Sequence, residues 1–230
     1  MKLGIIAAMK IEAEQIIASM TDVSTEICGS IEYTIGKIAN TEIVCAVCGI
    51  GKVFAAMCAQ TMIVKYAPDA VINTGVGGTL TKALSIGDVA VSTDTVQHDM
   101  DTSALGDPVG LISGINVIRL PADEKLGGKV CAIAAELGMK TCRGTIASGD
   151  RFIADQDVKK YITDNFGAIA CEMEGAAVGQ VCYVNKVPYL VIRAISDDAD
   201  GGACEDYPAF AKKSAENSAK LVIRLAGELY

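Results

Sequence analysis

Hydrophobic and polar positions along the chain follow two alternating patterns, which predict strands and helices in turn. The run Leu3–Ala8 is continuously apolar, as in a strand buried on both faces, whereas Lys10–Met20 places its apolar side chains at helical spacing. Strands are predicted at Leu3–Ala8, Ile31–Ile38, Thr41–Val47, Ala70–Thr74, Asp88–Ser92, Gly144–Ser148, Ala168–Glu172 and Tyr189–Ile195. Helices are predicted at Lys10–Met20, Lys52–Tyr66, Asp123–Leu137, Asp157–Asn165, Gly175–Tyr183 and Asp206–Leu229. This order predicts one α/β domain over residues 1–230, a three-layer α/β/α fold with a largely central sheet.

Two glycine-rich segments between these elements are candidates for contact with a ligand. Gly75–Gly78 follows the predicted strand Ala70–Thr74, and a turn of glycines lets backbone amides approach a ligand. Taken alone, such a turn is more often a tight connection than a binding loop. Its spacing is not that of a dinucleotide fingerprint, and the residues around Gly51 lack a glycine and a hydroxyl that a P-loop needs. The weakly patterned stretch Asp94–Asn116 is predicted to be a long functional loop.

Composition predicts a globular chain without a membrane span. Hydrophobic residues make up 51% and the mean hydropathy is +0.36, enough for a sizeable core. The longest stretches without a charge, residues 53–64 and 70–81, are shorter than the roughly 18 to 20 residues of a membrane helix. The N-terminal residues lack the pattern of a signal peptide, so we expect a cytoplasmic protein.

Charge and cysteine content narrow the class of partner. Twenty basic and 28 acidic residues give a net charge of -8, which disfavours nucleic acid and favours a small-molecule ligand. The nine cysteines lie in apolar settings, which is typical of reduced thiols. Cys45 and Cys48 have the spacing of half a zinc site, but a strand would place them on opposite faces and no second half-site exists. No metal is therefore expected.

Acidic residues lie at the carboxyl ends of two of the predicted strands, where open α/β sheets bind ligands. Glu172 and Glu174 would face the same side in an extended chain, and so would Arg193 and Asp197. Each has a plainer alternative as a solvated charge. Glu12 in the first turn of a helix is also explained by the helix dipole. His98-Asp99 has no serine of the G-x-S-x-G type to complete a triad, so a lone loop histidine is the better interpretation.

A family resemblance connects these pieces. Six motifs occur in one order: Gly4–Met9 followed by Glu12, then Gly49–Lys52, Asn73–Gly75, Ser148–Ile153, Glu172–Glu174 and Arg193–Asp197. Together they strongly resemble the 5′-methylthioadenosine/S-adenosylhomocysteine nucleosidases of the nucleoside phosphorylase superfamily, over nearly the whole chain. The resemblance implies a nucleoside phosphorylase-like fold around a mixed sheet, a homodimer, and no metal or organic cofactor.

The implied reaction is hydrolysis of an N-ribosidic bond, releasing adenine and a 5′-thio-substituted ribose in methionine salvage. Its oxocarbenium-like transition state needs an acid at the leaving base and a carboxylate that activates water on the opposite face of the sugar. By resemblance Asp197 is the acid at N7 of adenine and Glu12 is the base for water. By resemblance, Glu174 and Met173 hold the ribose hydroxyls, Phe152 and Ile153 contact adenine, and Arg193 orients both the water and Glu12. The pocket for the 5′ group is lined by Met9, Ile50 and Tyr207, together with residues near Thr102 and Leu105 of the partner subunit. Gly78, Glu172 and Ser196 are further substrate-binding residues.

Departures from the family pattern and competing functions remain. Val76 stands where many of these enzymes carry serine, and Tyr207 where phenylalanine is common. A phosphate-dependent purine nucleoside phosphorylase would need converging arginines, but the five arginines all lie beyond residue 100 and Glu12 would repel phosphate. A non-catalytic nucleoside-binding protein would dispense with the acid or the base, yet both are present. The sequence does not rank methylthioadenosine, adenosylhomocysteine, 5′-deoxyadenosine and aminodeoxyfutalosine.

Overall fold

The computed structural model describes residues 1–197 and 207–229, with side chains from residue 209 in the second range. The strands are β1 (Lys2–Ala7), β2 (Thr21–Cys28), β3 (Ile31–Ile38), β4 (Thr41–Val47), β5 (Ala70–Thr79), β6 (Val89–Gln97), β7 (Leu120–Pro121), β8 (Thr141–Ser148), β9 (Ala170–Glu172) and β10 (Tyr189–Asp197). The helices are α1 (Lys10–Ala18), α2 (Lys52–Tyr66), α3 (Glu124–Glu136), α4 (Gln156–Phe166), α5 (Gly175–Asn185) and α6 (Tyr207–Glu228), with a short 3-10 helix at Ser103–Leu105. The predicted alternation of strands and helices is confirmed.

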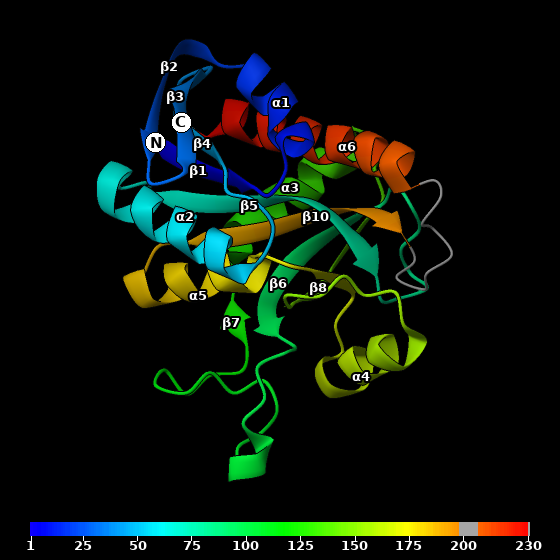
Figure 1. Cartoon of the computed structure of the whole chain (residues 1–230). Helices are drawn as coiled ribbons and strands as arrows, with labels where there is room; N and C mark the ends of the chain where they lie inside the picture. The colour runs from blue at the N-terminus through cyan, green and yellow to red at the C-terminus, as the bar shows by residue number, and fades with distance from the viewer. Residues whose placement is uncertain (198–206, 230) are drawn as a thin grey trace.

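All of these strands belong to one mixed sheet, drawn across the centre of Figure 1. Their order is β10-β6-β8-β9-β5-β1-β4-β3-β2, with β7 on β6. Because β10 also pairs with β5, the strands β5, β10, β6, β8 and β9 close into a ring. Pairings such as β1 with β5 are parallel, and others such as β10 with β6 are antiparallel, so the predicted mixed sheet is confirmed. The closed ring brings the carboxyl ends of β5, β9 and β10 together.

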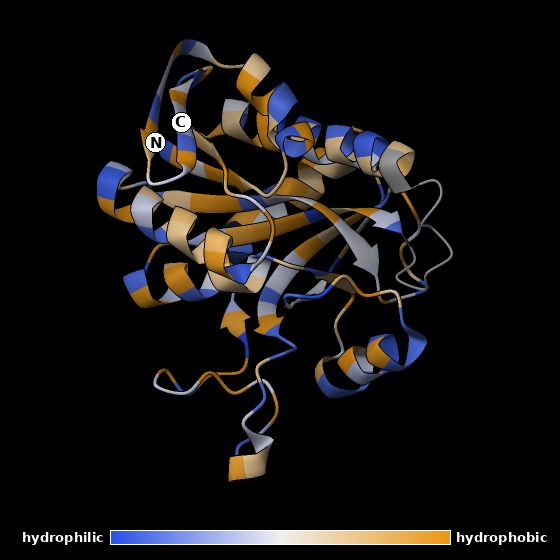
Figure 2. Ribbon diagram, in the orientation of Figure 1, coloured by the Kyte–Doolittle hydropathy of each residue, from blue (hydrophilic) through white to orange (hydrophobic). Residues whose placement is uncertain are grey.

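Helices cover both faces of the sheet. Along β1 the apolar side chains alternate, with Leu3 and Ile5 in a cluster with α1, α3 and α6, and Ile6 in a second cluster with α2 and α5. A third cluster lies beneath α4. In Figure 2 the strands are mostly hydrophobic, and hydrophilic segments gather on α1, α4 and α6. Cys45 and Cys48 fall in opposite clusters, as predicted. None of the described helices is long and apolar enough to cross a membrane.

Three local predictions were wrong. Thr21–Cys28 was not predicted as a strand, because its polar, mostly exposed residues lack an apolar face; it forms the sheet edge β2 by pairing with β3. Gly75–Gly78 is not a turn but the second half of β5, paired with β10 between Arg193 and Asp197. A β-carbon on Gly77 would lie 2.9 Å from the carbonyl oxygen of Cys171, so glycine permits this close approach. The predicted loop from Asp94 begins only after Gln97, where β6 ends.

Candidate active site

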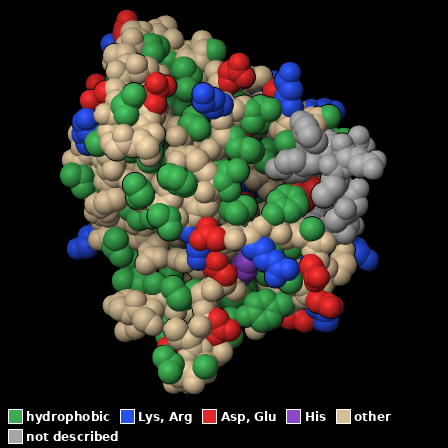
Figure 3. Space-filling view, viewed as in Figure 1, with side chains coloured by type: hydrophobic (Ala, Val, Ile, Leu, Met, Phe, Trp, Pro, Cys, Tyr) green, Lys and Arg blue, Asp and Glu red, His purple; other side chains and the backbone are tan. Residues whose placement is uncertain are grey.

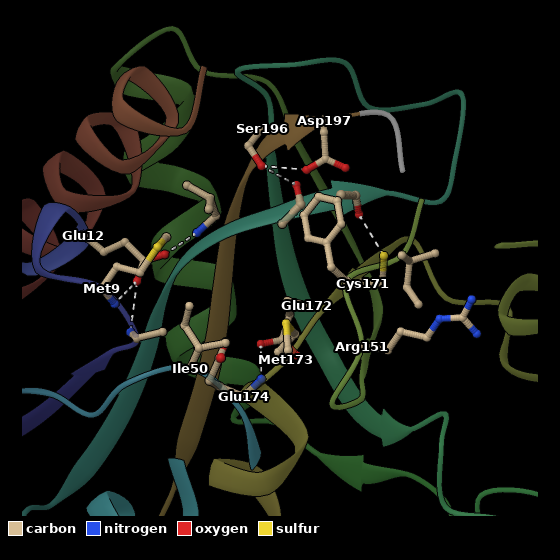
Figure 4. A pocket seen from close by; sticks show the side chains of 16 residues that line it. Met9, Glu12, Ile50, Arg151, Cys171, Glu172, Met173, Glu174, Ser196 and Asp197 are labelled. Carbon is tan, nitrogen blue, oxygen red and sulfur yellow. Dashed lines mark hydrogen bonds between the residues drawn. The ribbon is translucent and has the colours of Figure 1, made fainter. Parts of the chain in front are cut away.

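An open-mouthed pocket lies at the carboxyl ends of β1, β5, β9 and β10. Figure 3 shows the hollow on this face of the molecule, bordered by hydrophobic side chains, and Figure 4 shows its lining. The lining residues are Ala8, Met9, Glu12, Ile50, Val76, Gly77, Gly78, Arg151, Phe152, Ile153, Cys171, Glu172, Met173, Glu174, Ser196 and Asp197. Every predicted site residue is among them except Arg193, which lies behind the pocket, and Tyr207, whose side chain lies outside the described residues. The structure therefore brings the sequence motifs together at one site.

Glu12 is held by backbone amides from two segments. Its Oε2 accepts hydrogen bonds from the amides of Ala8 (3.0 Å) and Met9 (2.9 Å), as the third residue of a helix does when it caps its own N-terminus. Its Oε1 accepts from the amide of Val76 at 3.0 Å. Burial raises the pKa of Glu12 above its ordinary value, although the nearby charge of Arg193 and these amides oppose the rise. The result is a fixed carboxylate with a strengthened affinity for a proton.

Arg193 and Glu172 form a buried ion pair behind the pocket. A terminal nitrogen of Arg193, Nη2, donates to Glu172 and to Oδ1 of Asn73 at 2.5 Å. Glu172 also accepts hydrogen bonds from the Ser148 hydroxyl and from the amides of Glu174 (3.0 Å) and Gly175 (2.7 Å). Protein donors thus occupy both oxygens of Glu172, although its side chain borders the pocket. The pair fixes the turn that carries Glu174.

Glu174 is the carboxylate of this motif with capacity left for a ligand. Its Oε1 accepts from the amide of Gly51 at 2.8 Å, and its Oε2 lies 3.7 Å from Nη2 of Arg193. Burial, followed by the negative charge of Glu172, raises the pKa of Glu174 to about 7, against the opposing effect of Arg193. A developing positive charge in the pocket would favour its ionised form.

A bulge at the end of β10 aims Asp197 into the pocket. Ile195 pairs with Gly77 and Asp197 with Gly78, so Ser196 is an extra residue in the strand. Strict alternation would place Ser196 and Asp197 on opposite faces, but both line the pocket (Figure 4). The Ser196 hydroxyl donates to Oδ2 of Asp197 at 2.9 Å. Asp197 is therefore positioned by its strand and by its neighbour.

Apolar side chains complete the walls. Met9, Ile50, Phe152, Ile153 and Met173 line the pocket, with Phe152 and Ile50 about half exposed at 51% and 56%. Apolar walls with a small number of fixed polar groups are typical of a pocket for a small organic ligand. The carboxylates of Glu12, Glu174 and Asp197, which all line the pocket, suit a transition state that carries positive charge.

Sequence reasoning assigned no role to several residues that build the site. Arg151, Cys171 and Ala8 line the pocket, and Asn73 and Ser148 hold the buried ion pair. The signal for Asn73 and Ser148 was present, because each is a polar residue inside an otherwise buried strand. Among the described residues, no group of three or more histidines, cysteines or acids is arranged to hold a metal ion.

The fold and the site define a class of enzyme that cleaves nucleosides, the phosphorylase superfamily, whose family model matches residues 2–226. A 5′-methylthioadenosine/S-adenosylhomocysteine nucleosidase from Shewanella loihica is 40% identical over the full length of both chains. A Neisseria meningitidis nucleosidase of the same name, in complex with methylthio-immucillin-A, is 36% identical with a TM-score of 0.95 over 99% of each chain. An Asp-to-Asn mutant of the Helicobacter pylori enzyme with 5′-methylthioadenosine in its active site gives the same values. The chain belongs to the 5′-methylthioadenosine/S-adenosylhomocysteine nucleosidase family.

Proposed function

We propose that this chain hydrolyses the N-ribosidic bond of 5′-methylthioadenosine and S-adenosylhomocysteine, releasing adenine and the 5′-thio-substituted ribose. One observation carries the proposal: Glu12 from α1 and Asp197 from β10 reach a single pocket, and Figure 4 shows them on different sides of it. An acid and a base on different sides of a substrate are what hydrolysis with inversion requires. The names of the relatives support the same substrates.

The reaction begins at the bond between the ribose and adenine. As the bond between C1′ and N9 breaks, its electron pair moves onto adenine, and Asp197 donates a proton to N7. The sugar becomes an oxocarbenium ion, which the charge of Glu174 stabilises while its side chain holds the ribose hydroxyls. Glu12 removes a proton from water as the water oxygen bonds to C1′. Arg193 acts from behind the pocket, where its charge favours the ionised form of Glu12. General acid and base steps of this kind are each worth about 10² to 10⁴ in rate.

Water is favoured over phosphate as the nucleophile. A phosphate site needs cationic side chains directed at the anion. The guanidinium of Arg193 is already paired with Glu172, and Glu12 and Glu174 would repel an anion beside the sugar. A purine nucleoside phosphorylase is therefore the less favoured candidate, and so is a binding protein without activity, because both Glu12 and Asp197 are in place.

A homodimer would complete the 5′ side of the pocket. On the outer face of α2, close to the pocket residue Ile50, the apolar side chains of Val53, Phe54 and Met57 are exposed, and Leu105 is 84% exposed. Exposed apolar groups of this extent favour a second subunit. We propose that this face is the dimer interface and that residues near Thr102 and Leu105 enter the pocket of the partner. Light scattering coupled to gel filtration measures the expected doubled mass; a monomer at micromolar concentration contradicts it.

The reaction would serve methionine salvage in the cytoplasm. Its sugar product, methylthioribose, retains the methylthio group of methionine for reuse. All eight described cysteines are free thiols, which is consistent with a reducing compartment. A Helicobacter pylori futalosine hydrolase is 37% identical with a TM-score of 0.95, so aminodeoxyfutalosine and 5′-deoxyadenosine belong in the substrate panel.

Adenine release from methylthioadenosine tests the function. The purified protein is assayed in phosphate-free buffer and again with phosphate, and the sugar product is identified each time. We expect free methylthioribose at equal rates. Strict dependence on phosphate with a sugar 1-phosphate as product would instead make the protein a phosphorylase, and intact substrate after prolonged incubation would leave only binding.

A further inference from the structure

Three residues outside the pocket close a ring of hydrogen bonds beside it. The amide of Lys52 donates to Oδ1 of Asp150 at 2.7 Å, and the amide of Asp150 donates to Oδ2 of Asp99 at 3.0 Å. The ring closes where Nζ of Lys52 donates to Oδ1 of Asp99 at 2.5 Å. We refer to Lys52, Asp99 and Asp150 as the acidic latch. None of the three lines the pocket.

The latch connects two sides of the pocket: the adenine wall, formed by Phe152 and Ile153, and the ribose wall, which carries Glu174. Asp150 belongs to the loop that carries Phe152 and Ile153, whereas Lys52 begins α2. The neighbouring amide, that of Gly51, holds Oε1 of Glu174. Two successive amides at the N-terminus of α2 therefore bind one carboxylate from each wall. The partial positive charge of a helix N-terminus favours both.

Two glycines and the ionisation of Asp99 support the hydrogen bonds of the latch. Gly51 has a φ of +101°, and a β-carbon there would lie 3.0 Å from Oδ1 of Asp150. A β-carbon on Gly149 would overlap the ring of His98, which is buried directly before Asp99. Burial by itself would raise the pKa of Asp99, but the hydrogen bonds from Lys52 and Asp150 outweigh it, and the pKa lies below its usual value. The carboxylate of Asp99 is thus held ionised between its two donors.

The segment that carries Phe152 and Ile153 is anchored at both ends. Residues 149–155 form neither helix nor strand. In the first part of this segment the amide of Gly149 donates to the carbonyl of Glu172 at 3.2 Å, and Asp150 is held by the latch. The segment ends at Asp155, which caps α4. Between these two anchors, Ile153 packs in the third hydrophobic cluster and Phe152 lines the pocket.

We propose that Asp99 and Asp150 are positioning residues for adenine, acting through the loop that carries Phe152 and Ile153. By fixing residue 150 against the N-terminus of α2, the latch sets the distance between the adenine wall and the carboxylates of the site. The base then lies where Asp197 can protonate it. This inference rests on the proposed function, in which that loop binds adenine.

Trypsin cleavage at Arg151 tests the latch without any ligand. Arg151 is exposed and lies directly after Asp150. Asp99→Ala keeps the amino-acid sequence of residues 149–153 but removes the carboxylate that accepts hydrogen bonds from Asp150 and Lys52. Cleavage after Arg151 should therefore be at least about fivefold faster than in the native chain, a factor equivalent to about 1 kcal/mol. Asp164→Ala, which removes an exposed carboxylate paired with Lys160 on α4, is the control and should cleave at the native rate. Equal rates for Asp99→Ala and the native chain overturn the proposal.

Product binding separates positioning from general damage. Asp150→Ala should weaken binding of adenine about tenfold, equivalent to 1.4 kcal/mol, and leave binding of methylthioribose within about twofold. Asp150→Asn keeps an oxygen for the amide of Lys52 and should restore adenine binding. Unchanged adenine affinity in Asp150→Ala, or an equal loss for adenine and methylthioribose with a lowered Tm, overturns the proposal. If the native chain does not hydrolyse methylthioadenosine, the proposed function fails, and the trypsin comparison still decides whether the latch holds the loop.

Discussion

The β-carbon that Gly75 lacks would lie 2.5 Å from Oε1 of Glu12. Gly75 has an ordinary extended conformation in β5, so backbone strain does not explain the glycine. Its role is steric: the strand passes so close to Glu12 that the next amide, that of Val76, donates to the same oxygen. Because Gly75 has no side chain, β5 can approach Glu12 closely enough for the Val76 amide to hold the proposed base in position.

Gly75→Ala should therefore displace the Glu12 carboxylate. We expect kcat to fall by about 10²-fold, because a shift of about 1 Å in a reacting group costs that much, and stability to fall by about 1 to 3 kcal/mol through overpacking. Gly128→Ala is the matched control, since nothing lies within 4 Å of the new β-carbon. Native kcat in Gly75→Ala would show that Glu12 tolerates the displacement or is not the base.

Glu12→Gln should separate catalysis from folding. The glutamine keeps one oxygen for the amides that cap α1 but cannot take a proton from water, so kcat should fall by about 10² to 10⁴. Two effects on stability oppose each other. The NH2 group of glutamine faces backbone amide donors, which destabilises the fold. The loss of a negative charge whose burial is costly, as the raised pKa of Glu12 indicates, stabilises it. We expect a Tm close to native and unchanged adenine binding. Glu14→Gln, on the exposed side of the same helix, serves as control; unchanged kcat in Glu12→Gln means that water is activated elsewhere.

The alternation of apolar runs and helical periods was sufficient to predict the fold class. It works because strands such as β1 are buried on both faces and, after Lys2, have no polar side chain to interrupt the apolar run. It fails at β2, whose strand character comes from pairing with β3 and not from burial. It also fails at Gly75–Gly78, where composition suggests a turn but hydrogen bonds to β10 continue the strand.

The site was predictable where a motif is local and unpredictable where contacts cross the chain. The pocket residues of Glu172–Glu174 and Ser196–Asp197 were expected from short motifs. The pairing of Lys52 with Asp150, 98 positions away, leaves no pattern in sequence. The buried ion pair between Arg193 and Glu172 also joins positions that are distant in the sequence, and no local motif predicts it.

Asp197→Asn should retain the fold and lose the acid. Asparagine still offers an oxygen to the Ser196 hydroxyl but has no proton to give to N7 of adenine, so we expect kcat for methylthioadenosine to fall by at least about 10²-fold. Ser196→Ala should cost less, about three- to tenfold, because it removes one hydrogen bond to the carboxylate. Single-turnover release of adenine measures both. Near-native turnover by Asp197→Asn would remove the acid assignment.

Stability should depend on pH through Glu174. Because the folded state raises its pKa from 4.5 to about 7, folding is favoured while Glu174 is protonated; this contribution is complete below about pH 4.5 and is lost as the pH rises through about 7. At 1.36 kcal/mol per pKa unit, the free energy of unfolding of the native chain should fall relative to that of Glu174→Gln by up to about 3 kcal/mol between about pH 5 and pH 8. Glutamine keeps an oxygen for the amide of Gly51, so the comparison isolates the charge. Urea unfolding at several pH values measures the difference, with Glu14→Gln as the exposed control. Parallel pH profiles for the native chain and Glu174→Gln would mean that the pKa of Glu174 lies near its ordinary value. Glu174 would then already be ionised at neutral pH before substrate binds, and its charge could stabilise the oxocarbenium ion directly.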